Sequence, residues 1–147
     1  MDRDLRNSAV VTLGALAGSR DYLDRVDAGC GLANFAEVSE AAGFLRALIL
    51  DAGDTFVTLK TAEAVLRRKD RLGLEIVSSA LAEADSSHER WILSAVVNVF
   101  GIFVDDRDAA ALICQSLANG SDKAMSRGAL QLIEMLSEID PVLGPAG

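Results

Sequence analysis

The chain is poor in the residues from which catalytic and metal sites are most often built. Its 147 residues include one histidine, two cysteines and two prolines, and aromatic residues make up only 5%. His88 begins no zinc motif, because Ile92 stands four residues on, where a zincin helix needs its second histidine. With so little proline and no low-complexity tract, disorder is expected only at the ends. We therefore expect no metal and no cofactor.

Disulfide bonds and membrane insertion are also disfavoured. Cys30 and Cys114 lie far apart and form no CxxC pair, which favours a reduced, cytoplasmic protein over a disulfide framework. The N-terminus carries acids where a signal peptide needs a positive segment. The longest apolar run, Trp91–Val104, is interrupted by polar residues and, at 14 residues, is too short to cross a bilayer as a helix. We expect no membrane binding, and we expect Cys114 to be buried.

The charge balance is strongly acidic and limits the partners. The formal net charge is -8, which repels phosphate backbones and steers a cationic protein toward the surface. The sequence therefore predicts no nucleic-acid binding. The one basic cluster follows a predicted helix, where cations stabilise the C-terminal end; its other interpretation is a site for an acidic partner. The cluster comprises Arg67, Arg68, Lys69 and Arg71.

Other polar and glycine-bearing segments have structural interpretations. The acidic run at 105–108 lacks the spacing and the glycine of a calcium loop, so we expect Asp106 to cap the next helix. The Gly-Cys-Gly segment at 29–31 lacks the third glycine of a dinucleotide cradle and predicts a flexible turn. Ser94 and Asn98 lie one turn apart in the most apolar helix, and we expect a hydrogen bond to a neighbouring helix.

Apolar residues recur at helical spacing along most of the chain, and no segment shows the period-two alternation of a strand. Asp70, Asp105 and Asp140 are 35 residues apart, and each follows an apolar helical segment. Aligned on those aspartates and on Asp21, four segments share apolar columns. They are RNSAVVTLGALAGSRD, TFVTLKTAEAVLRRKD, RWILSAVVNVFGIFVD and MSRGALQLIEMLSEID. One column holds Leu13, Ala62, Val97 and Leu132, and the next holds Leu16, Val65, Phe100 and Met135. Partner helices are predicted between them, around 35–50, 71–84 and 107–118.

A unit of two helices cannot bury its own apolar face, so it must stack on its neighbours. In its period and apolar columns the chain resembles the HEAT/armadillo-like repeat superfamily over nearly its whole length. The resemblance implies an all-α fold: a right-handed α–α superhelix of about 3.5 hairpins and roughly seven helices, in a single domain of residues 1–147. The Pro bend and fixed Arg of regular HEAT repeats are missing, so a compact irregular helical bundle is the alternative.

The first unit is longer than the others. Asp21 to Asp70 spans 49 residues against 35 elsewhere, and the extra 14 are placed at 21–34. Insertions in solenoids form loops on one face, often a binding face. The alternative is a structural insertion with a short extra helical turn at 22–26. The Gly- and Pro-containing tail at 141–147 is expected to end the stack.

Three classes of function remain open. The first is a non-enzymatic protein–protein interaction module, an adaptor or inhibitor of the kind found in bacteria, whose second helices present a groove; one form is an immunity-type protein that neutralises a basic toxin. The family resemblance also implies a HEAT-like lyase or other ligand-binding enzyme. The third is a structural subunit that self-associates through the apolar ends of the stack. For the oligomeric state we expect a monomer or a weak homodimer. We assign no catalytic residue. The candidate partner-binding residues are Tyr22, Asp24, Asp27, Glu37, Glu40, Arg67, Arg68, Arg71, Glu75 and Trp91.

Overall fold

The computed structural model describes residues 2–144, and this part of the chain is helical apart from its turns. The all-α class is confirmed, with one helix more than the sequence predicts. The elements are α1 (Arg3–Ala17), α2 (Tyr22–Leu32), the 3-10 turn η1 (Ala33–Phe35), α3 (Ser39–Ile49), α4 (Thr55–Leu66), α5 (Arg71–Leu81), α6 (Ser86–Phe100), α7 (Val104–Ala118) and α8 (Lys123–Ser137). A single parallel bridge, Phe103 to Leu143, is the one β contact between residues 2 and 144.

Aspartates begin most of the helices. The N-cap carboxylate accepts a hydrogen bond from a backbone N–H of the first turn, which has no acceptor within the helix. Each such cap stabilises the fold by about 1 kcal/mol. The capping residues are Asp2, Asp21, Asp54, Asp70, Asp85 and Asp122. The expectation that Asp106 caps a helix is wrong. Phe103 holds the N-cap position of α7, and Asp106 lies in its first turn, where an acid favours the helix dipole.

The inserted segment 21–34 is not a loop, and the predicted extra turn is a complete helix. Helix α2 lies between α1 and α4, and Ala28 and Leu32 are fully buried. The predicted flexible turn at 29–31 is therefore wrong. A Cβ at Gly29 would lie 2.2 Å from Thr61 Oγ1 on α4. The glycine that suggests a turn in the sequence is required by close helix packing.

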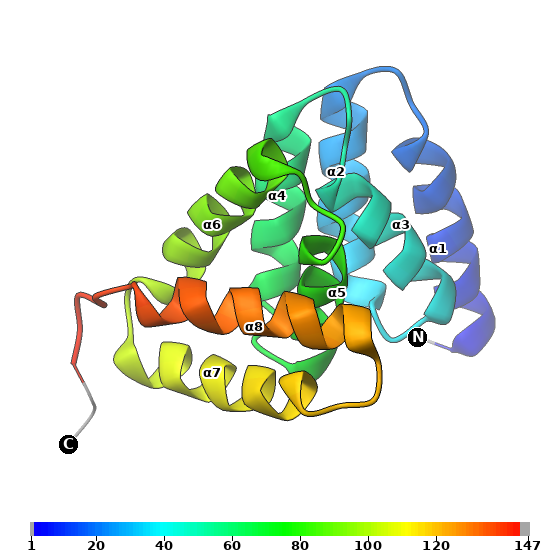
Figure 1. The fold of residues 1–147 in the computed structure, drawn as a ribbon. Helices are drawn as coiled ribbons and strands as arrows, with labels where there is room; N and C mark the ends of the chain where they lie inside the picture. The colour runs from blue at the N-terminus through cyan, green and yellow to red at the C-terminus, as the bar shows by residue number, and fades with distance from the viewer. Residues whose placement is uncertain (1, 145–147) are drawn as a thin grey trace.

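Helices α2, α4 and α6 pack side by side, and α1 covers the outer side of α2 (Figure 1). The sequence alignment places the segment of α1 in the same column as α4, but in the structure α2 is the neighbour of α4. Helix α3 packs against both α4 and α5. One continuous apolar core runs through these helices, with Phe100, Leu32 and Leu45 among its largest fully buried side chains.

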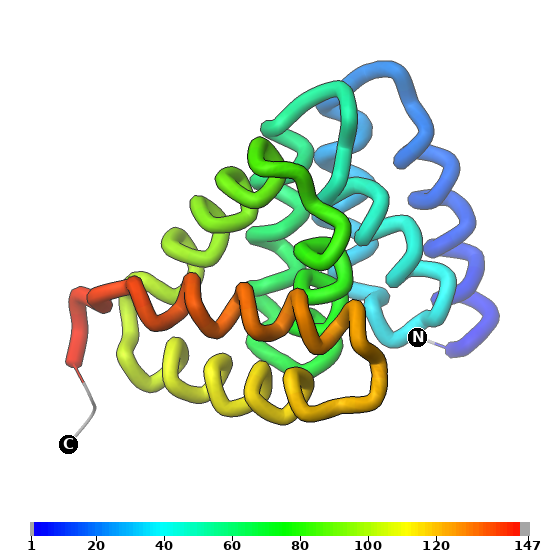
Figure 2. The backbone as a smooth tube through the Cα atoms, in the orientation of Figure 1, coloured from blue at the N-terminus to red at the C-terminus, as the bar shows by residue number. Residues whose placement is uncertain are grey.

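Helices α7 and α8 form an antiparallel pair that lies across the lower end of the other helices (Figure 2). Helix α8 packs against α5 and α7 far more than against α6. At the crossing with α5, a Cβ on Gly128 would lie 1.7 Å from the carbonyl oxygen of Ser78. Helix α8 therefore covers the α5 and α7 part of the face on which the sequence predicts a groove formed by the second helices. Between α3 and α5 a hollow of about 320 Å³ stays open, and its lining includes Gly43, Arg46 and Glu75.

Five polar contacts between helices join residues at nearly the same sequence separation, although others, such as Arg25 to Asp51 and Arg71 to Ser116, do not. Two of the five span 35 residues, Arg68 to the Ala33 carbonyl and Asn98 to Glu63. Three others span 37 residues: Arg46 to Glu83, Lys69 to Asp106, and His88 to the Asp51 carbonyl. Corresponding positions of successive helix pairs are therefore in contact at the spacing of the sequence repeat.

Alanine at Gly128 is expected to destabilise the protein, because its methyl group would overlap backbone of α5 that cannot rotate away. Overpacking of this kind costs about 1–3 kcal/mol. The free energy of unfolding from urea titration measures the loss.

Gly43→Ala is the matched control. Gly43 is also helical, but nothing lies within 4 Å of its added Cβ, so this change should stabilise α3 by about 0.5–1 kcal/mol. Equal shifts in the two variants would contradict the close crossing of α5 and α8.

Candidate functional site

The predicted partner-binding residues do not gather at one place. Tyr22, Asp24 and Asp27 lie on α2, and Trp91 is half-buried on the second turn of α6. Tyr22 packs edge-on against Phe56 of α4, with ring centroids 6.3 Å apart. Asp24 accepts a hydrogen bond from the Ser19 hydroxyl at 2.7 Å. Glu37 follows η1, Glu40 lies on α3 and Glu75 on α5.

The basic cluster is neutralised by acids of the same chain. Arg68 contacts Asp70 at 2.8 Å and also donates to the Ala33 carbonyl, so it ties the turn between α4 and α5 to η1. The other three cations have carboxylate partners as well: Arg67 with Glu63 at 3.5 Å, Lys69 with Asp106 at 2.8 Å and Arg71 with Glu75 at 3.1 Å. These pairs favour the structural interpretation of the cluster over a site for an acidic partner.

Glu63 is a nearly buried carboxylate at the centre of the three-helix layer. Its side chain accepts a hydrogen bond from Asn98 of α6 at 3.2 Å, and the Lys60 ammonium lies 3.4 Å away. The interhelical role predicted for Asn98 is confirmed. Ser94 instead bonds to the Arg90 carbonyl of its own helix. The Glu63–Asn98 hydrogen bond therefore links α4 to α6.

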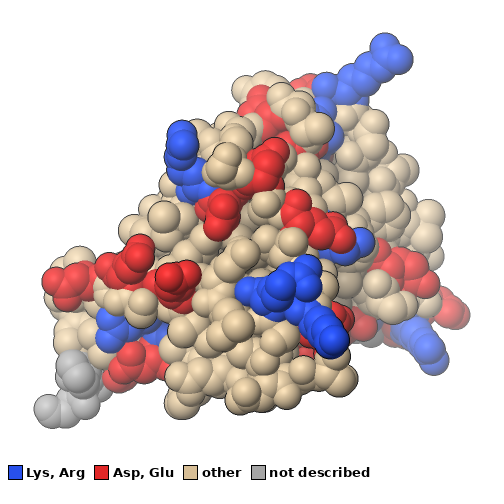
Figure 3. Space-filling view, in the orientation of Figure 1, with Lys and Arg blue, Asp and Glu red and all other residues tan. Residues whose placement is uncertain are grey.

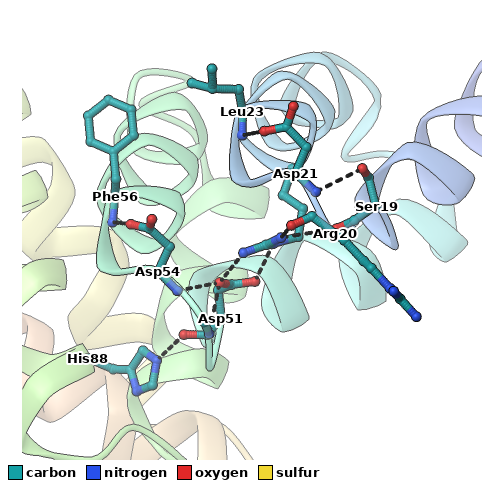
Figure 4. A network of polar contacts seen from close by, with 10 residues as sticks. Ser19, Arg20, Asp21, Leu23, Asp51, Asp54, Phe56 and His88 are labelled. Atoms are coloured by element: carbon teal, nitrogen blue, oxygen red, sulfur yellow. Dashed lines mark hydrogen bonds and ion pairs between the residues drawn. The ribbon is translucent and has the colours of Figure 1, made fainter.

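A second polar network joins the turns at the upper edge of the molecule (Figure 4). The Arg25 guanidinium contacts both carboxylate oxygens of Asp51, at 3.0 and 3.2 Å, and the two side chains are largely buried. Asp51 also accepts from the backbone N–H of Asp54. The His88 ring lies 2.7 Å from the Asp51 carbonyl and 2.8 Å from the Asp85 carboxylate. This network fixes the start of α6 against the α3–α4 turn.

The titration of His88 and Asp85 follows from these contacts. The hydrogen bond to the Asp51 carbonyl, with a further contribution from Asp85, raises the pKa of His88 above its ordinary value. The His88 backbone N–H, and to a lesser degree its ring, lower the pKa of the Asp85 carboxyl. The charged forms of both residues are therefore favoured in the folded state.

Neither cysteine is activated for nucleophilic chemistry. Desolvation, with a smaller contribution from Asp27, raises the pKa of the Cys30 thiol, although the residue is exposed. Burial raises the pKa of Cys114 to about 12, and the predicted burial of Cys114 is confirmed. A reactive cysteine needs a lowered pKa, so both thiols stay protonated near neutral pH.

An apolar groove runs between α1 and α3, and we call it the α1–α3 groove. Its central hollow of about 700 Å³ is lined by Asn7, Val10, Val11, Glu40, Gly43 and Phe44. Adjoining hollows extend it to the start of α1, past Arg3 and Glu37, and to the end of α1, past Gly18 and Ala47. Val11 is 71% exposed on one wall.

Sequence reasoning found only part of this groove. Glu37 and Glu40 were predicted as partner-binding residues, and both line it. Phe44 of α3 is 37% exposed, and its ring lies over Gly14 of α1. The signal that could have located the groove is Gly43, a glycine within an amphipathic helix that no turn explains.

The part of the chain that the structure describes shows neither a metal site nor a membrane-spanning helix. Between residues 2 and 144, no group of three or more His, Cys, Asp or Glu side chains is placed to hold a metal ion. In the same range, no helix is both long enough and apolar enough to cross a membrane.

Comparisons with known proteins give little further information. The sequence matches no protein-family model, and no curated protein matches it. Among solved structures, the crystal structure of an engineered protein is similar over 87% of this chain, with 22% sequence identity and a TM-score of 0.36. The chain spans 62% of the length of that protein.

The stability contributed by His88 is expected to fall as the pH rises. Because its pKa is raised on folding, the contribution is complete below the unfolded pKa near 6.5 and is lost as the pH rises through the folded pKa. The unfolding free energy of the protein minus that of His88→Gln should therefore be larger at roughly pH 5.5 than at roughly pH 9.

Asp85→Asn is the control, since it removes one partner of the ring and should reduce the pH dependence. If the difference in unfolding free energy between the protein and His88→Gln stays constant with pH, the contacts of a charged His88 ring with Asp51 and Asp85 are ruled out. At acid pH the opposite trend applies to Asp85, whose lowered pKa gives stability that is lost as the pH falls through it.

Proposed function

We propose that this chain is a non-enzymatic protein–protein interaction module that binds a partner in the α1–α3 groove. The observation that carries the proposal is the groove itself, an apolar channel along two neighbouring helices with Val11 and Phe44 exposed on its walls. Exposed apolar grooves of this kind are typical of surfaces that receive a helix or another apolar segment of a partner.

Gly43 supports the same interpretation. A glycine within a helix costs about 1 kcal/mol relative to alanine, so it needs a compensating reason. At Gly29 and Gly128 the reason is a close helix crossing within the chain, but no atom lies within 4 Å of a Cβ added at Gly43. A partner backbone that approaches α3 closely would account for the missing side chain.

The proposal also includes the arrangement of the helix pairs, the cellular compartment and the charge of the partner. We infer a short right-handed α–α superhelix of the HEAT kind, in which α2/α3, α4/α5 and α6/α7 are successive hairpins. Contacts at separations of 35 and 37 residues support it. Two unpaired cysteines are consistent with the cytoplasm. The net charge of -8 favours a cationic partner, as in the immunity-type version of this role.

Photo-crosslinking tests the groove directly. Benzoylphenylalanine placed at Val11, in cells from which the protein comes, should crosslink one stoichiometric protein that mass spectrometry identifies. Leu112 is the matched control position, because it is 67% exposed on α7 and lines no part of the groove. Gly43→Leu in the Val11 background should reduce the crosslink at least about tenfold, because the new side chain projects toward the groove.

The outcomes separate the alternatives. The same crosslinked products from Val11 and Leu112, or an unchanged yield with Gly43→Leu, would contradict binding in the groove. A crosslink from Val11 to a second copy of the chain would favour the self-associating subunit instead.

A further inference from the structure

A second hollow lies at the opposite end of the molecule, where α6 and α8 finish. We call it the end pocket. It holds about 440 Å³ and is lined by Leu93, Val97, Gly101, Met135, Glu138, Ile139, Asp140 and Val142. Its position does not depend on the α1–α3 groove, which is formed by other helices.

Several apolar side chains in and beside the end pocket are exposed to solvent. Val142 is 81% exposed and Val97 is 45% exposed. Beside them, Ile102, Phe103 and Leu143 are each nearly half exposed. Contiguous exposed apolar residues on a globular chain are typical of a binding surface.

Backbone hydrogen bonds hold this apolar surface in place. The Val142 N–H donates to the Gly101 carbonyl at 3.1 Å, and the Leu143 N–H donates to the Ile102 carbonyl at 2.7 Å. In return, the Val104 N–H donates to the Leu143 carbonyl at 3.0 Å. The segment after α8 is thus bonded to the turn between α6 and α7, so the exposed side chains belong to a defined surface.

The polar rim of the end pocket is acidic. Glu138 and Asp140 line it, both are exposed, and neither has a partner within residues 2–144. Figure 3 shows acidic side chains gathered over this end of α8, at the left of the view. The cation placed nearby is Arg107, which already pairs with Asp108 and donates to the Ile139 carbonyl. No Lys or Arg lines the pocket.

The geometry points to a cationic amphipathic segment of a partner protein as the occupant of the end pocket, with apolar side chains against Val97 and Val142 and Lys or Arg against Glu138 and Asp140. A second copy fits less well, because a twofold contact at this site would bring like carboxylates together. Nucleic acid is disfavoured by the same charges. The surface therefore selects a partner by both hydrophobicity and positive charge.

A designed peptide pair tests this assignment. The probe is a fluorescein-labelled amphipathic helix of about 18 residues, made of leucine and lysine, and its counterpart carries glutamate in place of every lysine. Fluorescence anisotropy should show binding of the lysine peptide and none of the glutamate peptide. Raising NaCl from about 50 mM to about 500 mM should weaken binding, because it shortens the Debye length from about 14 Å to about 4 Å.

Variants locate the binding site. Glu138→Gln with Asp140→Asn should weaken the lysine peptide about threefold to tenfold, the range expected for two exposed ion pairs. Val97→Ser with Val142→Ser should weaken it about fivefold or more through lost apolar burial, and both positions are exposed enough to leave the fold intact. Asp4→Asn with Glu89→Gln removes the same charge at positions that do not line the end pocket and should change affinity less than about twofold.

Three results would overturn the assignment. One is equal weakening by the Asp4/Glu89 and Glu138/Asp140 variants, which would indicate only general attraction to an acidic protein. Another is loss of binding with Gly43→Leu and not with Val97→Ser/Val142→Ser, which would place the peptide in the α1–α3 groove. The third is a dimer in sedimentation velocity that Val142→Ser dissociates. None of them changes the crosslinking result at Val11, so failure here is distinguishable from failure of the proposed function.

Discussion

Two close helix crossings, made possible by missing side chains, determine how this chain folds. Gly29 lets α2 approach α4 at Thr61, and Gly128 lets α8 approach α5 at Ser78. A methyl group at either position would collide with atoms of the neighbouring helix, and at Ser78 these are backbone atoms that cannot move independently. The first crossing places α2 between α1 and α4. The second brings α8 across α5, where it can pack on α7 as well. The positions of both exposed surfaces follow from these two contacts.

Polar contacts then set the register of helices that apolar packing alone would allow to slide. Lys69, Arg68 and Asn98 each reach a residue in the preceding or following pair of helices. Their separations of 35 and 37 residues match the sequence repeat, because equivalent positions of successive pairs meet. Most of these contacts are only partly buried, so each adds little to stability. These contacts favour one alignment of the helices over others. They also neutralise Arg and Lys side chains that the sequence alone would suggest are free to bind a partner.

The helical class and much of the core could be predicted from the sequence, because they depend on local periodicity, whereas the predicted cap at Asp106 was wrong. In one predicted column Val65, Phe100 and Met135 are buried, while the fourth member, Leu16, is only partly buried. In the other, Ala62 and Leu132 are buried, Leu13 is partly buried, and Val97 is 45% exposed at the end pocket. Periodicity assigns a residue to a helix face, whereas burial depends on whether another helix covers that face.

The candidate surfaces were harder to predict for the same reason. Nothing in the local sequence indicates that α8 covers α5 and α7, and part of the expected groove of second helices stays open as a hollow between α3 and α5. Nor does the sequence distinguish a glycine packed against a neighbouring helix from one with open space beside it, and the segment at 29–31 was therefore interpreted as a turn. The ion pairs of Arg67 and Arg71 with acids four residues away follow from helical spacing, whereas the contacts of Lys69 with Asp106 and of Arg68 with the Ala33 carbonyl do not.

The two exposed surfaces differ in chemistry, and this difference bears on how the chain could act. The α1–α3 groove has charges of both signs near its ends, including Arg3 and Glu37. The end pocket has carboxylates alone on its rim. An apolar surface of low dielectric constant strengthens the attraction between a neighbouring carboxylate and a cation. In a chain of net charge -8, we therefore expect a cationic partner to be attracted more strongly to the end pocket than to the groove. Under the two proposals, the α1–α3 groove and the end pocket would therefore receive partners of different chemistry.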